Sequence, residues 1–205
     1  YRSMFFLPLL LTESWLPLRG THEKYQRINR GIRISSSCDS YANGAPIGIP
    51  SGLLARRILL TLVSKSVIDK TPVIDVGSVS ELLRDSGLVK SGKQVRRIQK
   101  TLFQLFMVNV KIWGTTSIHN GQMFEERGLD VEETKQEKFS FIPKKVVFRD
   151  KFYKDVIEGK SYPFLTEDIL KANGALEHDI LLWLLNRQVK ISKKSAEFLG
   201  YGLLF

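Results

Sequence analysis

Residues 87–106, GLVKSGKQVRRIQKTLFQLF, contain a spacing that could bind nucleotide phosphates. Gly87, Gly92 and Lys93 match most of a phosphate loop, in which backbone amides surround the phosphates and a following Ser or Thr hydroxyl binds Mg²⁺. Position 94 is Gln, whose amide does not replace that hydroxyl. The loop should also follow a buried strand, whereas residues 78–86, SVSELLRDS, have the pattern of an amphipathic helix. We therefore expect that the chain neither binds nor hydrolyses ATP.

The same residues form a two-faced helix when they are placed at 100° per residue. One arc is apolar and contains Val95, Ile98, Leu102, Leu105 and Phe106. The opposite arc, about 100° wide, is basic and free of acids, and contains Lys93, Arg96, Arg97, Lys100 and Gln104. Surface helices usually mix charge signs, because like charges four residues apart repel. The pattern therefore favours a helix that contacts a polyanion.

Arginine is suited to DNA because its planar fork can donate two hydrogen bonds to guanine O6 and N7, while lysine serves mainly as a positive charge near phosphates. We predict that this helix and the turn before it contact double-stranded DNA. The residues predicted to bind DNA are Lys90, Ser91, Lys93, Gln94, Arg96, Arg97, Lys100 and Gln104.

The elements around this helix predict an α+β fold with a winged helix-turn-helix. A buried helix is expected over 53–68, with Ser51 as its N-cap, then a short strand over 71–77. A short helix over 78–87 begins with a Ser78/Glu81 capping box and ends at Gly87, and the basic helix follows over 92–108. Alternating residues at 108–113 and 139–148 predict a long β-hairpin, the wing, whose tip is the acidic segment 121–138.

We divide the chain into three parts. Residues 1–45 are expected to be an N-terminal extension and linker with a short strand at 31–35, and FFLPLLL at 5–11 is expected to join a core. Residues 46–150 form the winged-helix domain. Residues 151–205 are expected to be a linker helix followed by an incomplete second winged helix that starts with two helices over 165–188. Its partly unpartnered leucines predict self-association as a homodimer: Leu181, Leu182, Leu184 and Leu185.

The composition favours a nucleic-acid partner. The net charge is +10 and the pI about 9.7, although residues 121–138 hold six acids and three bases.

The lone Cys38 cannot form an internal disulfide, which points to the cytoplasm. FFLPLLL is too short to span a bilayer, so no membrane is expected. The three histidines are scattered, so we expect neither a metal nor another cofactor.

Four blocks, in this order, resemble the plasmid-encoded RepA replication initiators: GIPSGLLARRILL from Gly48, PVIDVGSVSELLRDSGL from Pro72, the RRIQKTLFQL segment after Ser91-Gly92, and HDILLWLLNR from His178. The resemblance spans roughly residues 16–188. It implies an initiator with two winged-helix domains that binds repeated origin DNA, helps to open it and recruits host replication proteins. It also implies that the protein has no catalytic centre.

Two alternatives stay open. A winged-helix transcriptional regulator would need only one or two operators, whereas an initiator would need arrays of repeated sites. A protein-interaction module with the same fold would bind no duplex at all.

Overall fold

A computed structural model describes residues 4–8, 16–20, 23–29, 32–41, 44–89, 91–113, 117–125, 143–158 and 161–198. The chain has a mixed α+β fold, as predicted. The helices are α1 (Gly52–Asp69), α2 (Val79–Asp85), α3 (Gly92–Met107), α4 (Asp150–Phe152), a π-helical turn η2 (Tyr153–Glu158), α5 (Thr166–Leu170) and α6 (Ala175–Phe198). The strands are β1 (Met4–Pro8), β2 (Lys24–Asn29), β3 (Ile32–Ser37), β4 (Val73–Asp75), β5 (Asn109–Trp113), β6 (Ser117–Gln122), β7 (Lys145–Val147) and β8 (Ser161–Leu165).

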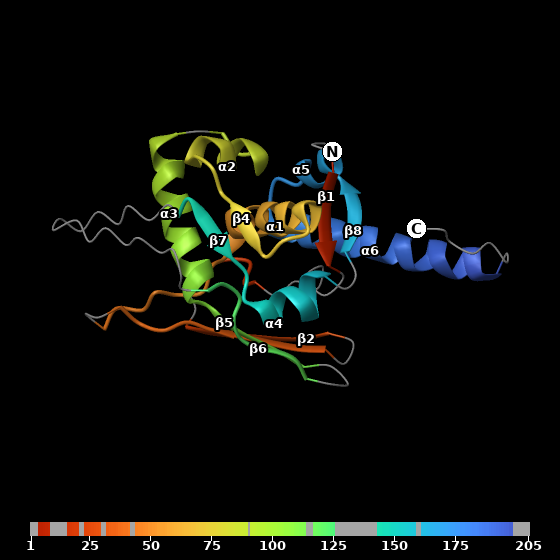
Figure 1. Cartoon of the computed structure of the whole chain (residues 1–205), viewed down its shortest axis with the longest axis horizontal. Helices are drawn as coiled ribbons and strands as arrows, with labels where there is room; N and C mark the ends of the chain where they lie inside the picture. The colour runs from red at the N-terminus through yellow and green to blue at the C-terminus, as the bar shows by residue number, and fades with distance from the viewer. Residues whose placement is uncertain are drawn as a thin grey trace.

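Helix α1 lies at the centre of the molecule, and the other elements surround it (Figure 1). All its residues from Leu54 to Ser64 are buried, which agrees with the nearly continuous apolar sequence predicted to form a buried helix. Ser51 occupies the N-cap position but its side chain does not cap the helix. Ser51 is therefore the N-cap residue as predicted, but its hydroxyl donates to the Gly20 carbonyl at 2.8 Å.

Strand pairing differs from the predicted hairpin. Strand β5 pairs with β3 on one side and β6 on the other, and these strands form a four-stranded antiparallel sheet in the order β2-β3-β5-β6. Strand β7 pairs antiparallel with β4. The prediction that 108–113 and 139–148 form one hairpin was therefore wrong, although both contain strands.

A short backbone pairing lies at the two ends of the acidic segment. Glu125 donates its backbone N–H to the Val147 carbonyl at 2.8 Å, and Arg149 donates to the Met123 carbonyl at 2.9 Å. Residues 123–125 and 147–149 thus run side by side at the base of residues 126–142, which lie outside the described residues, as does most of the segment 121–138 predicted as the tip of the wing.

Aromatic rings join this region to α3. Phe106 of α3 stacks on Phe124 with ring centroids 4.7 Å apart, and Phe124 stacks on Phe148 at 4.6 Å. Phe148 stacks in turn on Phe152 of α4 at 5.7 Å. Such contacts add to the burial of apolar area, so the end of α3 is fixed against β7 and α4.

The two flanking parts pack onto the same core. Strand β1 pairs with β8, and Phe5 and Leu7 are buried, which confirms that this part of FFLPLLL joins a core. The pairings β1–β8 and β3–β5 join residues on opposite sides of the expected boundaries at 45 and 150. The short strand expected at 31–35 is present as β3, and the two helices expected over 165–188 are α5 and α6. The division into three parts, with a truncated second winged helix, stays a prediction.

Candidate nucleic-acid interface

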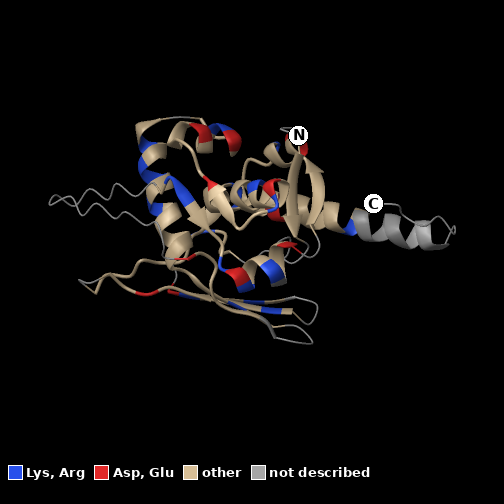
Figure 2. Cartoon of the chain, in the orientation of Figure 1, with Lys and Arg blue, Asp and Glu red and all other residues tan. Residues whose placement is uncertain are grey.

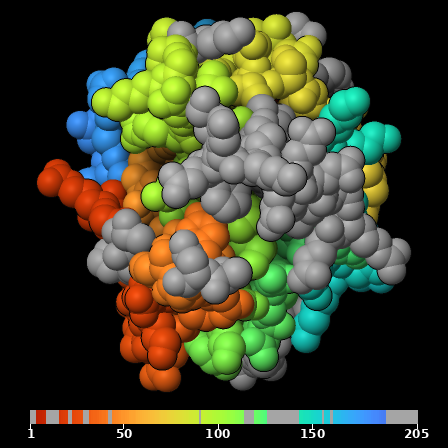
Figure 3. Space-filling model, turned by 90° about the vertical axis from the view of Figure 1, so that its left-hand side faces the viewer, coloured from red at the N-terminus to blue at the C-terminus, as the bar shows by residue number. Residues whose placement is uncertain are grey.

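Helix α3 has one buried and one exposed face. Ile98, Leu102 and Leu105 have no exposed surface, and Phe106 is nearly as buried, as the apolar arc predicted. The four basic residues predicted on the other face are all exposed: Lys93, Arg96, Arg97 and Lys100. In Figure 3, which looks onto this side of the molecule, the yellow-green atoms of this part of the chain reach the surface.

The other predicted contact residues have different environments. Ser91 is exposed and caps α3, because its hydroxyl accepts the backbone N–H of Gln94 at 3.2 Å. Gln94 is half-buried. Lys90 lies outside the described residues.

Gln104 does not belong to the exposed face. Its side chain is buried, and Nε2 donates to the Ile47 carbonyl at 2.9 Å. The prediction that Gln104 contacts DNA is corrected, because its amide is used inside the protein. A helical projection could not reveal this, since it places Gln104 inside the basic arc, between Lys93 and Arg97, and the partner of Gln104 is 57 residues away in sequence.

The turn between α2 and α3 is held by a buried arginine. Gly87 has a φ of +64°, a backbone conformation that favours glycine, and a Cβ there would lie 2.5 Å from Leu170 of α5. Arg57 of α1 donates from Nη1 to the Gly87 carbonyl at 3.0 Å. Its Nη2 donates to the carbonyls of Leu170 and Ala172 at 3.0 and 2.9 Å. Arg57 therefore connects α1 to the turn that precedes the basic helix and to α5. Burial lowers the pKa of Arg57.

The position of Gly87 also bears on the phosphate-loop spacing. Gly87 follows the end of α2, and Gly92 begins α3. The segment thus joins two helices and does not follow a strand, which confirms that the structural context of a phosphate loop is missing. The absence of ATP binding stays a prediction.

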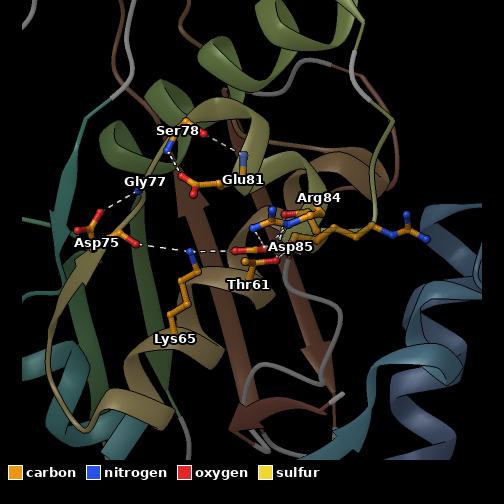
Figure 4. Close-up of polar contacts among 10 residues, drawn as sticks. Thr61, Lys65, Asp75, Gly77, Ser78, Glu81, Arg84 and Asp85 are labelled. Carbon is orange, nitrogen blue, oxygen red and sulfur yellow. Dashed lines mark hydrogen bonds and ion pairs between the residues drawn. The ribbon is translucent and has the colours of Figure 1, made fainter. Parts of the chain in front are cut away.

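A capping network fixes the start of α2 (Figure 4). The Ser78 hydroxyl accepts from the Glu81 N–H at 3.2 Å, and the Glu81 carboxylate accepts from the Ser78 N–H at 2.7 Å, which confirms the predicted capping box. These hydrogen bonds with Ser78 lower the pKa of Glu81. Asp75 accepts the Gly77 N–H at 2.9 Å, which turns the chain from β4 into the helix.

Further polar contacts in Figure 4 hold α2 against α1. Lys65 of α1 forms an ion pair with Asp85 at 3.1 Å. The hydroxyls of Thr61 and Ser86 lie 3.0 Å apart and both are buried. With the capping network, these contacts fix α2 at both ends, and α2 in turn determines where α3 can begin.

A second buried arginine attaches α6. Arg56 donates from Nε and Nη2 to the two carboxylate oxygens of Asp179, at 2.6 and 2.7 Å. Its remaining N–H groups donate to the carbonyls of Leu16, Pro17 and Gly52, at 2.7, 3.0 and 3.1 Å. The side chains of Arg56 and Asp179 are 5% and 9% exposed, so this is a buried, bidentate pair. The sequence gives a weak signal for it, since two consecutive arginines interrupt an otherwise apolar helix.

Lys144 and Lys145 were not among the residues predicted to bind DNA, and both are exposed at the base of the segment 126–142. Figure 2 shows basic residues in blue on α3 and on β7. The Phe106, Phe124 and Phe148 stack places the strand that follows Lys144 beside α3. Their position in the sequence could have drawn attention to these lysines, because they lie in the segment 139–148, which was expected to be the second strand of the wing.

Within the residues that the structure describes, no three His, Cys, Asp or Glu side chains gather as a metal site would require. Over the same residues, no helix combines the length and the apolar character needed to cross a membrane.

No family model matches the chain, and no curated protein is significantly similar to it in sequence. The solved structures to which the chain is similar include two crystal structures of domains 2 and 3 of RctB, one of them from SeMet derivatives. Each superposes with a TM-score of 0.47, at sequence identities of 12% and 11%. The alignments cover 71% of this chain but only 59% and 57% of the RctB chains, which is less than two thirds of their length.

Proposed function

We propose that residues from α1 to β7 form a winged helix and that α3 is its recognition helix, which binds double-stranded DNA in the major groove. The observation that carries the proposal is the exposed face of α3. Lys93, Arg96, Arg97 and Lys100 lie on it, and α3 contains no acidic residue. Because the opposite face is packed in the core, these side chains project from a fixed support.

The order of elements supports the winged-helix part of the proposal. A winged helix places a helix and a short strand before the helix-turn-helix, and a hairpin after it whose returning strand pairs with that short strand. Here α1, β4, α2 and α3 come in this order, and β7 returns to pair with β4. The insertion of β5 and β6 between α3 and residues 123–125 departs from the simplest form of this arrangement.

We further propose that the protein is a plasmid replication initiator that binds repeated sites at an origin and works with host replication proteins in the cytoplasm, without catalysing a reaction itself. This finer proposal rests on the ordered sequence blocks that resemble the RepA initiators. Footprinting on the DNA that neighbours the gene separates it from the regulator alternative. An array of repeated protected sites is expected of an initiator, and one or two sites would favour a transcriptional regulator.

The decisive experiment selects duplexes from a randomised pool and then measures affinity by fluorescence anisotropy at several salt concentrations. Arg96→Ala and Arg97→Ala should each weaken binding to the selected duplex by about 1–3 kcal/mol, roughly 5- to 150-fold, for any arginine that reads a base. Lys151→Ala removes one exposed charge from α4 and is the matched control. Unchanged affinity in both arginine variants, with wild-type thermal melting, would exclude α3 from the interface.

A further inference from the structure

The four-stranded sheet has one face packed on the protein and one face that no other described element covers. Ile34, Val110, Ile112 and His119 are buried on the inner face. Figure 1 shows this sheet below the helices, with its other face directed away from them. Alternation along the paired strands places eleven described side chains on that outer face: Lys24, Gln26, Ile28, Arg33, Ser35, Ser37, Asn109, Lys111, Trp113, Asn120 and Gln122.

The charge of this outer face has a single sign. Lys24, Arg33 and Lys111 are exposed on three adjacent strands, and none of the described outer-face positions is acidic. Most of the other positions carry amides or hydroxyls. A solvated sheet surface usually mixes charges, so this one is complementary to a polyanion.

An exposed tryptophan lies among these bases. Trp113 is 38% exposed and pairs in register with Arg33, and Lys111 lies two residues away on the same face. An indole ring offers a flat surface on which a nucleobase can stack, while arginine and lysine beside it can contact the phosphates on either side. Amide side chains such as Gln26, Asn109 and Asn120 can both donate to and accept from base edges.

The shape of the surface indicates which nucleic acid fits. A broad sheet face does not enter a major groove, which admits a helix or a two-stranded ribbon. Stacking on Trp113 needs a base whose face is free, and the bases of a duplex are stacked on one another. We propose that the outer face of the β2-β3-β5-β6 sheet binds single-stranded DNA, with Trp113 as the stacking residue and Arg33 and Lys111 as phosphate contacts. This surface is separate from α3 and goes beyond the proposed function.

The test uses the full chain and three fluorescent probes: a 20-nucleotide oligothymidylate, an oligouridylate of the same length, and the selected duplex. Trp113→Ala should weaken oligothymidylate binding about tenfold, while Trp113→Phe, which keeps an aromatic ring, should lose less than about threefold. The double variant Arg33→Gln/Lys111→Gln should also lose about tenfold and reduce the salt slope by about 1.4, from about 0.7 for each phosphate contact. Duplex affinity should stay within about twofold in all of these variants.

The matched control is Lys151→Gln/Lys154→Gln, which removes the same charge from exposed positions in α4 and η2. An equal loss in this control, or no loss in Trp113→Ala, would overturn the proposal, and so would tighter binding of oligouridylate than of oligothymidylate. Polyglutamate is a polyanion without bases. If it competed for the protein as effectively as oligothymidylate does, binding would depend on charge alone, and the proposal would also be overturned. If Trp113→Ala does not fold, Trp113→Phe and the charge variants still decide. Arg96→Ala and Arg97→Ala test duplex binding only. If α3 does not read DNA, these two variants keep their duplex affinity, whereas if the sheet does not bind single strands, Trp113→Ala keeps its affinity for oligothymidylate.

Discussion

Removing the Asp179 carboxylate should destabilise the protein more than the loss of any surface ion pair would. In Asp179→Ala, Arg56 loses two charge-assisted hydrogen bonds of 2.6 and 2.7 Å, and its guanidinium remains in a site where the side chain is only 5% exposed. Breaking one partner of a buried pair typically costs 3–5 kcal/mol, because the remaining charge stays desolvated. That is a large part of a total stability of roughly 5–15 kcal/mol.

The assay is urea unfolding followed by two probes, far-UV circular dichroism and tryptophan fluorescence, whose coincidence checks for a two-state transition. Asp168→Ala is the matched control, because Asp168 pairs with Lys171 at 2.8 Å on the surface, where both side chains are exposed. It should cost less than about 1 kcal/mol. Amide exchange would show whether the loss in Asp179→Ala is confined to α6 or extends to α1.

A double-mutant cycle tests the pairing itself. Arg56→Met alone leaves the Asp179 carboxylate buried and deprives the Leu16 and Pro17 carbonyls of their donor. The double variant Arg56→Met/Asp179→Leu should therefore cost clearly less than the sum of the two single changes. If Asp179→Ala were within about 0.5 kcal/mol of the wild type, or if the two changes were additive, the attribution of α6 docking to this pair would be refuted.

Three further predictions concern single residues. Gln104→Leu should cost about 1–3 kcal/mol in urea unfolding, because the Ile47 carbonyl loses its buried donor, and duplex affinity should not change; the opposite pattern would return Gln104 to the interface. Gly77→Ala should lower the free energy of unfolding by about 1–3 kcal/mol, since Gly77 has a φ of +68° and an added Cβ would lie 2.5 Å from Glu81 Oε2. Gly174→Ala is the control: space around an added Cβ is open there, so the same measurement should show almost no change. Burial raises the pKa of the Cys38 thiol to about 11 from an ordinary 9.0, so iodoacetamide should modify the folded protein about 100-fold more slowly at pH 7.5 than the urea-unfolded chain, and equal rates would contradict the burial.

The helices around the site could be predicted from the sequence because their signals are local. The capping box of Ser78 and Glu81 and the glycine at 87 fix α2 within a ten-residue window, and the structure has both. The spacing of Ile98, Leu102 and Leu105 gave the buried face of α3 for the same reason. In each case the interacting residues lie within a few positions of each other in the chain.

Strand partners were mistaken because alternation identifies a strand without identifying its neighbour. Residues 109–113 alternate as predicted, but β3, more than 70 residues earlier in the chain, pairs with them together with β6. The nearest later alternating segment was the natural choice for a hairpin, since sequential strands are often neighbours. The N-terminal strands have weak patterns of their own, and only their pairing shows that they complete a sheet.

Arg56 and Arg57 show what a pattern of residue types cannot convey. They are adjacent on a buried helix, where charge is expected only if it is paired. Arg57 connects the turn before α3 to α5, and Arg56 connects the segment at Leu16 and Pro17 to Asp179 on α6. All these partners are distant in sequence, and most are backbone carbonyls, which any residue type supplies. Two arginines in the central helix thus connect the turn before α3, the recognition helix that we propose, with both flanking parts of the chain. For that reason, a substitution at Arg57 should alter both the stability of the protein and the position of α3, whereas a substitution at Arg96 should alter DNA affinity alone.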